Sequence, residues 1–308
     1  MTYPWKPEFE KRLRLLARLA MRVGGGMLAY RPQKLPAGGT EMTGLRDYTT
    51  GDDPKRVDWN ICARHDELRT REYGGTAVRY AYLLVDGSNA VSVGKKTLEA
   101  IRTSAVMLAY GLLYGGAVVR VGTFARTLSL FPPVMGRQRA GRIAKALAQT
   151  APKDEATDFS AVVTAFLNRN VPVGDVYLVS DFFGAAETFA GGYSEGLLQL
   201  HRKGYRVHLI HLIVPENRAD GKTGDVMITD NRGYRMAITL TERDLHAYQK
   251  LYDGYLEGVK KYSTDHGLRY TRVWANAPEE TLCLAALGLP AGSARVNPWA
   301  EYITKKTS

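Results

Sequence analysis

Short apolar runs alternate with longer amphipathic segments along most of this chain. Tyr80–Val85 is an apolar run of strand length that ends at Asp86, and Val176–Val179 is a second such run, followed by Asp181 after one residue. A helix-like segment begins near Leu98, after the first run. Strands that alternate with helices predict a doubly wound, mostly parallel sheet.

The same patterns assign the remaining elements after residue 80. Further strands are predicted at 117–122, 126–130, 207–214 and 269–274, the second as a hairpin partner of the first. Helices are predicted at 137–149, 159–167, 193–203, 242–265 and 278–287, with a small hairpin at 226–239. These segments predict one α/β domain over residues 80–290, with a hairpin insertion near 222–239.

The part before residue 80 has a different pattern. Residues 9–23 predict a basic amphipathic helix, for which we favour packing on the main domain or a partner over binding to a membrane surface. We divide this part into a helix and loop at 1–39 and a charged, strand-rich segment at 40–79 with a turn at 51–54. Residues 291–308 form a C-terminal tail.

The composition is that of a globular protein, with 45% hydrophobic and 24% charged residues among 308. The net charge is +11, and no Asp or Glu occurs between Ala100 and Lys153. This basic stretch is typical of a face for nucleic acid, lipid head groups or an acidic protein, although a solvated helix face is the more ordinary interpretation. No RNA-binding or zinc-finger signature accompanies it, so nucleic acid is a weak prediction.

The compartment is predicted from cysteines and hydropathy. Cys62 and Cys283 are the only cysteines, which favours a reducing compartment. The first residues carry charges throughout and do not resemble a signal peptide. The uncharged run Thr103–Val119 is shorter than the roughly 20 residues of a spanning helix. We therefore expect a cytoplasmic protein without a membrane span.

Several enzyme motifs are absent. Gly94-Lys95 resembles the end of a phosphate-binding loop, but Asn89 stands where that motif needs glycine. No Gly-x-Ser-x-Gly elbow occurs, so a hydrolase serine has no support. His208 and His211 are three residues apart on a predicted strand, so they face opposite sides and do not form a metal pair.

Four oxygen-bearing residues remain as candidates. Asp86 ends the first strand, Ser88 follows in its turn, and Asp181 lies at the end of another strand. Thr157 begins the loop that enters a predicted helix. The carboxyl ends of parallel strands share one edge of a sheet, so we expect these side chains to converge there. Carboxylate and hydroxyl oxygens are ligands of hard divalent cations.

The segment 40–73 carries a dense set of alternating charges. Asp52, Asp53 and Asp58 would be metal ligands in one interpretation, but many arginines lie beside them. Pairing of these carboxylates with arginine is therefore the favoured interpretation.

The order of these motifs resembles the domain-of-unknown-function family fifty-eight, from about Thr40 to about Leu289. Asp86-Gly87-Ser88-Asn89-Ala90, Thr157-Asp158 and Ser180-Asp181 are similar to its later motifs. The earlier matching positions are Arg46, Tyr48, Gly51, Asp52, Asp53, Arg56, Asp58, Trp59, Ala63 and Arg64.

The resemblance implies a von Willebrand factor A-like, Rossmann-like domain with one antiparallel edge strand and helices on both faces. It also implies a metal-ion-dependent adhesion site for Mg²⁺ formed by Asp86, Ser88, Thr157 and Asp181. Ala90 replaces a ligand serine of the family motif, so we expect weakened or lost Mg²⁺ binding.

Family members resemble partners of MoxR-type AAA+ ATPases that act in the assembly or maturation of other proteins. The leading hypothesis is therefore a non-enzymatic adaptor that works with such an ATPase on client proteins. One rival is a protein that binds nucleic acid or an anionic surface through residues 120–153. The other is a metal-dependent hydrolase, for which these motifs supply no histidine or glutamate as a general base.

Overall fold

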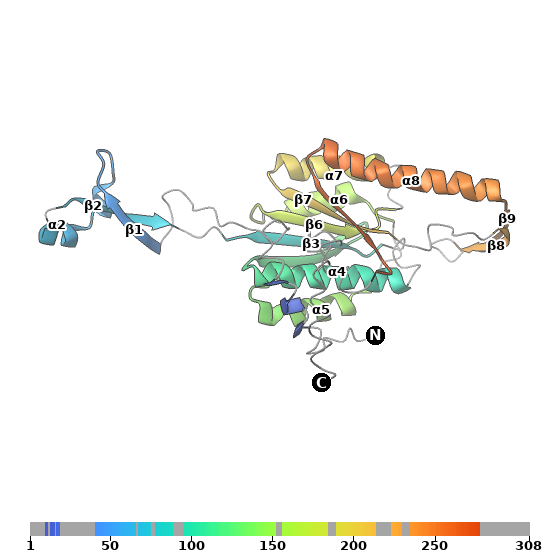
Figure 1. Cartoon of the computed structure of the whole chain (residues 1–308), viewed down its shortest axis with the longest axis horizontal. Helices are drawn as coiled ribbons and strands as arrows, with labels where there is room; N and C mark the ends of the chain where they lie inside the picture. Colours follow the sequence, from blue (N-terminus) through green and yellow to red (C-terminus); the bar gives the residue numbers. More distant parts are fainter. Residues whose placement is uncertain are drawn as a thin grey trace, which may run out of the picture. The chain divides into compact units, whose positions relative to one another are not determined.

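The computed structural model describes residues 10–11, 13–15, 17–18, 41–65, 67–74, 78–88, 95–151, 156–183, 189–213, 223–229 and 235–277. The chain divides into two compact units (Figure 1). Unit 2 comprises residues 30–78, and unit 1 comprises residues 1–29 together with 79–308.

Unit 1 contains a six-stranded sheet with the strand order β10-β7-β6-β3-β4-β5. All neighbouring strands are parallel except β5, which pairs antiparallel with β4 at one edge. The strands are β3 (Tyr80–Asp86), β4 (Val118–Phe124), β5 (Leu128–Leu130), β6 (Asp175–Ser180), β7 (Arg206–Ile213) and β10 (Arg269–Trp274). This is the von Willebrand A-like architecture predicted for residues 80–290, with its single antiparallel edge strand.

Helices cover both faces of this sheet (Figure 1). One layer consists of α4 (Lys95–Tyr114) and α5 (Ala140–Gln149), and the short 3-10 helix η2 (Arg137–Arg139) precedes α5. The other layer consists of α6 (Phe159–Leu167), α7 (Phe189–Arg202) and α8 (Glu242–Asp265). Because both faces are covered, β3 and β6 are apolar and buried along almost their whole length.

The direction of the β3 side chains alternates between two cores. Leu83 and Val85 pack in the cluster that contains α4 and α5. Tyr82 and Leu84 pack in the cluster that contains α6 and α7. Asp86 continues the second series, so the period of two along a strand directs its side chain toward the α6 and α7 side.

The N-terminal helix packs on unit 1 in the part that the structure describes. Leu13 and Ala17 are buried in the same apolar cluster as α4. The favoured prediction of packing on the main domain is confirmed at these residues.

Element boundaries differ from prediction at α7, which begins at Phe189 rather than at Tyr193. Gly191 and Gly192 weaken the helical signal of this first turn because glycine has a low helix propensity. The Phe189 ring is buried and stacks on Tyr193 with a centroid distance of 5.1 Å. This packing overrides the local propensity.

The predicted hairpin is present as β8 (Gly224–Thr229) and β9 (Arg235–Leu240), which form a two-stranded sheet of their own. The helix predicted at 278–287 lies outside the described residues. Within those residues, none of the helices combines the length and apolar character that crossing a membrane requires.

Unit 2 is built on an antiparallel pair, β1 (Glu41–Asp47) and β2 (Arg69–Gly74). Between them lie the 3-10 helix η1 (Pro54–Arg56) and the α-helix α2 (Trp59–His65). The strand-like prediction for this stretch was therefore wrong at 59–65. The Asp58 carboxylate accepts hydrogen bonds from the backbone N–H groups of Asn60 and Ile61 and so starts a helix there.

Candidate functional site

Asp86 is fixed at the carboxyl end of the central strand β3. Its side chain is buried, and its Oδ1 accepts a hydrogen bond from the Ser88 backbone nitrogen at 2.9 Å. Its Oδ2 accepts a hydrogen bond from the Ser180 hydroxyl at the end of the neighbouring strand β6. Two adjacent strand ends therefore hold one carboxylate in a fixed orientation.

Asp181 follows β6 directly and is also buried. Its Oδ1 accepts a hydrogen bond from the Phe183 nitrogen at 3.1 Å. Phe182 between them has a φ of 58°, which is uncommon for a residue with a bulky side chain. That conformation accompanies a buried Phe182 ring, which packs against Phe189 and Tyr193.

The two carboxyl groups influence each other. Burial raises the pKa of Asp86, and the hydrogen bonds from the Ser180 hydroxyl and the Ser88 backbone nitrogen oppose this rise. Burial and then the nearby charge of Asp86 raise the pKa of Asp181 to about 7. Two carboxylates that disfavour each other's ionisation in a buried site would be stabilised by a cation between them.

Ser88 and Thr157 lie in segments that both contact the end of β4: the Gly87 nitrogen donates to the Phe124 carbonyl, and the Asp158 nitrogen donates to the Ala125 carbonyl. Both side chains are buried, and neither the Ser88 Oγ nor the Thr157 Oγ1 makes a hydrogen bond to another described residue. Thr157 is held in place because Asp158 caps α6: its carboxylate accepts from the Ala161 nitrogen at 3.0 Å. Buried hydroxyls without partners are rare in folded proteins and mark a place where a ligand atom is expected.

We call Asp86, Ser88, Thr157 and Asp181 the oxygen cluster. All four are described, all are buried, and all lie at the carboxyl edge of β3 and β6 or in the loop before α6. Two carboxylates and two unpaired hydroxyls form a donor set of oxygen atoms alone, which fits Mg²⁺. Ala90 lies outside the described residues.

Three residues beside the cluster were not among the sequence candidates. Ser180 orients Asp86 through its hydroxyl, and the sequence signal for it was the resemblance of Ser180-Asp181 to a family motif. Tyr193 is fully buried, and its pKa is raised well above the usual value by burial and then by the charges of Asp86 and Asp181. His211 is fully buried, its Nδ1 lies 2.8 Å from the Tyr270 hydroxyl, and burial lowers its pKa to about 3.

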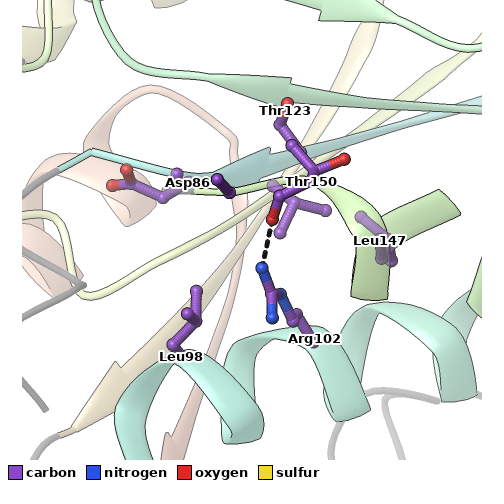
Figure 2. Close-up of a pocket in the computed structure, with 9 residues that line it drawn as sticks. Asp86, Leu98, Arg102, Thr123, Leu147 and Thr150 are labelled. Carbon is purple, nitrogen blue, oxygen red and sulfur yellow. Dashed lines mark hydrogen bonds between the residues drawn. The ribbon is translucent and has the colours of Figure 1, made fainter. Parts of the chain in front are cut away.

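A small cavity of about 10 Å³ lies on the other side of the Asp86 backbone. It is lined by residues of β3, β4, α4 and α5, among them Leu98, Arg102, Thr123 and Leu147 (Figure 2). Arg102 donates a hydrogen bond to the Thr150 carbonyl, and the Asp86 carboxylate points away from this space. The cavity has room for roughly one water molecule, so it is not a substrate pocket.

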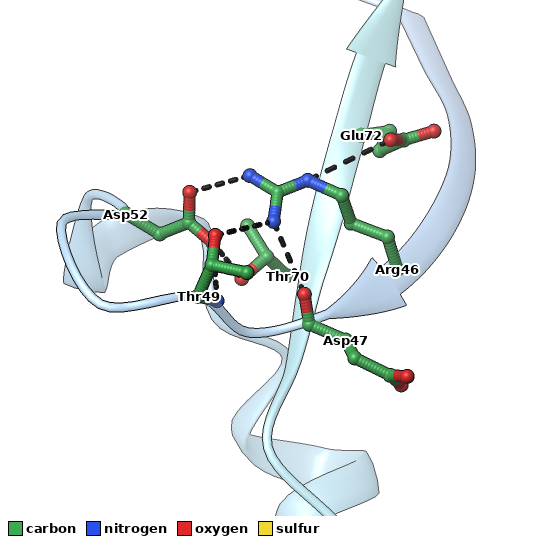
Figure 3. Close-up of polar contacts among 6 residues, drawn as sticks. All are labelled: Arg46, Asp47, Thr49, Asp52, Thr70 and Glu72. Atoms are coloured by element: carbon green, nitrogen blue, oxygen red, sulfur yellow. Dashed lines mark hydrogen bonds and ion pairs between the residues drawn. The ribbon is translucent and has the colours of Figure 1, made fainter.

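Two family-motif residues of unit 2, Arg46 and Asp52, belong to a network of ion pairs and hydrogen bonds (Figure 3). The Arg46 guanidinium pairs with Asp52 and, at 3.6 Å, with Glu72. Asp52 also accepts hydrogen bonds from the Thr49 nitrogen at 2.9 Å and the Thr70 hydroxyl at 3.1 Å. The hydrogen bond from Arg46 holds the pKa of Asp52 well below its usual range. The Asp52 carboxylate is thus paired with an arginine, which is the interpretation that the sequence analysis favoured.

The other motif residues of unit 2 have structural contacts or face solvent. Asp58 pairs with Arg71 at 2.9 Å, and Asp53 caps η1 by accepting from the Lys55 nitrogen at 3.0 Å. Tyr48 donates its backbone N–H to the Leu68 carbonyl, Gly51 has a φ of 108°, and Arg56 is half-buried. Trp59 is 61% exposed, and Arg64 is exposed.

Among solved structures, the chain is similar to the conserved hypothetical protein BatB from Bacteroides thetaiotaomicron, with 16% identity over 68% of this chain and 95% of BatB and a TM-score of 0.42. It is also similar to a von Willebrand factor type A protein from Catenulispora acidiphila, with 10% identity over 69% of this chain and 42% of that protein and a TM-score of 0.40.

A third similar structure is proximal thread matrix protein 1 from the mussel byssus, described with a zinc-occupied MIDAS motif, at 14% identity over 44% of this chain and 38% of that protein, with a TM-score of 0.35. A search among curated proteins finds no match. The sequence profile described as "Protein of unknown function DUF58" matches residues 44–251, which is more than half of the chain. The chain therefore belongs to the DUF58 family.

Proposed function

We propose that this protein is a non-enzymatic interaction protein that holds Mg²⁺ at the oxygen cluster and binds an acidic residue of a partner protein there. One observation supports the proposal most: two buried carboxyl groups that influence each other lie at one sheet edge, with buried hydroxyls that lack a described partner in the turn after β3 and in the loop before α6. The site would act as a metal-ion-dependent adhesion site.

The energetics of the cluster support a cation. A buried hydroxyl without a partner costs about 1–3 kcal/mol, and two such groups are present. Burial also opposes ionisation of both Asp86 and Asp181. When bound, Mg²⁺ supplies a positive charge that offsets both costs and attracts the carboxylate of a partner.

The surroundings of the cluster support binding rather than hydrolysis. A hydrolase needs a general base that is free to reach the substrate. The Asp181 carboxyl has a pKa of about 7, but in this proposal it serves as a metal ligand. His211 is the histidine beside the cluster, but it is fully buried and stays neutral because burial lowers its pKa to about 3. His208 lies on the opposite face of β7, stacked on Tyr177 at 4.5 Å.

We further propose that the partner is a MoxR-type AAA+ ATPase in the cytoplasm and that the complex acts on client proteins during their assembly or maturation. The support for this step is the resemblance of the family motifs. Because the ATPase would supply the energy of hydrolysis, this chain needs no ATPase activity of its own.

Co-purification of the full chain with a MoxR-type ATPase from the same organism, in the presence of ATP and Mg²⁺, tests the proposal. We expect the wild type and an Asp253→Asn control, altered on the exposed side of α8, to bind equally. Asp86→Asn keeps the shape of the side chain but removes its charge and is expected to abolish binding. Rapid ATP hydrolysis by this chain alone, or undiminished binding by Asp86→Asn, would contradict the proposal.

A further inference from the structure

Three arginines gather around two tyrosines of α4, on the side of unit 1 that faces the N-terminal helix. The Arg18 Nε donates to the Tyr114 hydroxyl at 3.2 Å, and the Arg137 guanidinium carbon lies 5.4 Å from the centre of the Tyr114 ring. Arg14 lies close to Tyr110, whose hydroxyl raises the pKa of this guanidinium. The two tyrosine rings are stacked with a centroid distance of 6.4 Å. We call these five residues the arginine–tyrosine cluster.

The positive charge of this cluster is only partly compensated. Glu10 pairs with Arg14 at 3.2 Å. Neither Arg18 nor Arg137 has a carboxylate within ion-pair distance among the described parts of the chain. The sequence of α4, η2 and α5 explains this shortage, because no Asp or Glu occurs between Ala100 and Lys153. Like charges held on one aromatic platform repel each other unless an anion lies between them.

Tyr114 orders Arg18 and Arg137 without neutralising them. A guanidinium placed over an aromatic ring is held by a cation–π interaction, and its remaining N–H groups stay available. Arg14, Arg18 and Arg137 are all exposed, so those groups face solvent. Guanidinium groups ordered in this way bind oxyanions with two parallel hydrogen bonds.

The burial of the tyrosine rings limits which class of anion the arginines can bind. Single-stranded nucleic acid binds by stacking its bases on accessible aromatic rings. Tyr110 is only 1% exposed and Tyr114 is half-buried, so neither ring presents a free face of this kind. Arg18 and Arg137, which have no carboxylate partner among the described residues, instead match the charge of a phosphate monoester, about −1.5 to −2 at neutral pH. We propose that the arginine–tyrosine cluster is a binding site for a phosphate monoester.

Calorimetric titrations of the full chain with inorganic phosphate and with a phosphoserine peptide test this site. The double variant Arg18→Gln/Arg137→Gln changes two exposed side chains and should fold normally. We expect saturable binding by the wild type and a loss of at least about tenfold in affinity in the double variant. An Arg243→Gln control changes an exposed arginine on α8 and should bind like the wild type.

A higher affinity for the peptide than for inorganic phosphate would identify a phosphorylated protein as the source of the phosphate. The reverse order would identify a small phosphorylated molecule. Substitution of both arginines with lysine keeps the charge but loses the planar fork, so it should weaken binding less than glutamine does. Titration of Mg²⁺ should be unchanged in all of these variants, which separates this site from the oxygen cluster.

Three results would overturn the proposal. The first is no saturable binding of either phosphate probe. The second is equal weakening by Arg243→Gln, which would show a response to net charge alone. The third is binding of duplex DNA or of vesicles with anionic lipid by a wild type that does not bind the phosphoserine peptide.

Discussion

At the residue scale, Asp175 joins three cationic or titratable side chains at the start of β6. Its carboxylate lies 2.8 Å from the Arg79 Nε, 2.7 Å from the Arg206 Nε and 3.5 Å from the His208 Nε2. Burial alone would raise the pKa of Asp175, but the hydrogen bond from His208 and the charge of Arg79 outweigh it and hold the pKa well below the usual range. The network fixes Arg79, the residue just before β3.

We predict that Asp175→Asn lowers the free energy of unfolding by about 3–5 kcal/mol, because it removes the charge that pairs with the buried Arg79. Arg206 contacts the same carboxylate but its side chain is 64% exposed, so Arg206→Gln should cost less than about 1 kcal/mol. Urea denaturation measures both values. Equal effects of the two variants would show that burial of the ion pair does not matter.

Because the pKa of Asp175 is lowered in the folded state, we expect its contribution to the stability of the fold to depend on pH. A depressed pKa contributes stability that is present above the pKa of the unfolded state and is lost as the pH falls toward that of the folded state. The stability difference between the wild type and Asp175→Asn should therefore be constant near neutral pH and narrow below about pH 4. A difference that narrows on the alkaline side instead would assign the effect to another group.

Unit 2 offers a contrast between a paired and an exposed charge. Asp58 pairs with Arg71 and accepts two backbone hydrogen bonds at the start of α2, whereas Arg64 is exposed at the end of that helix. We predict that Asp58→Ala lowers the melting temperature of this unit and that Arg64→Ala leaves it unchanged. Thermal scans followed by the fluorescence of the exposed Trp59 would show this, and a loss with Arg64→Ala would reveal a contact of that side chain.

At the element scale, α6 and α7 pack closely because α7 has a glycine at their contact. A Cβ atom on Gly196 would lie 2.7 Å from the Phe159 ring and 3.0 Å from Val163. Gly254 on α8 has no such neighbour, since nothing lies within 4 Å of the corresponding position. Gly196 therefore allows close packing of α6 and α7, whereas the position of Gly254 has room for a side chain.

Matched alanine variants separate these two cases. Gly196→Ala overfills the contact and should lower the free energy of unfolding by about 1–3 kcal/mol. Gly254→Ala should raise it by roughly 0.5–1 kcal/mol, because alanine has the higher helix propensity and meets no obstacle. If both variants are stabilised, the α6–α7 contact is looser than the structure shows.

Some of these helices and strands could be predicted from sequence patterns, and others could not. The buried strands β3 and β6 and the helix α8 were predictable because apolar runs and amphipathic periods extend over their whole length. The helix α2 was not, since seven residues in a charged segment carry too little periodicity and a single cap at Asp58 decides their structure. At the oxygen cluster, the ends of the predicted strands identified Asp86 and Asp181. Tyr193 and His211 lie beside the cluster because of tertiary packing, which no local sequence pattern predicts.

At the scale of the whole molecule, the two units differ in whether their charged side chains form ion pairs. Unit 2 pairs arginines with carboxylates within a small sheet and exposes Trp59. Unit 1 buries carboxylates at the edge of its sheet and leaves arginines exposed beside α4. The proposed Mg²⁺ and phosphate sites rest on different residues, so variants of one should leave the other intact.

Calorimetric titration of Mg²⁺ into the purified chain decides whether the oxygen cluster holds a metal ion. We predict weak binding by the wild type, no binding by Asp86→Asn, and binding about tenfold tighter by Ala90→Ser, which restores the hydroxyl of the family motif. If Ala90→Ser binds Mg²⁺ no better than Asp86→Asn does, the oxygen cluster holds no metal and the partner is bound by another surface.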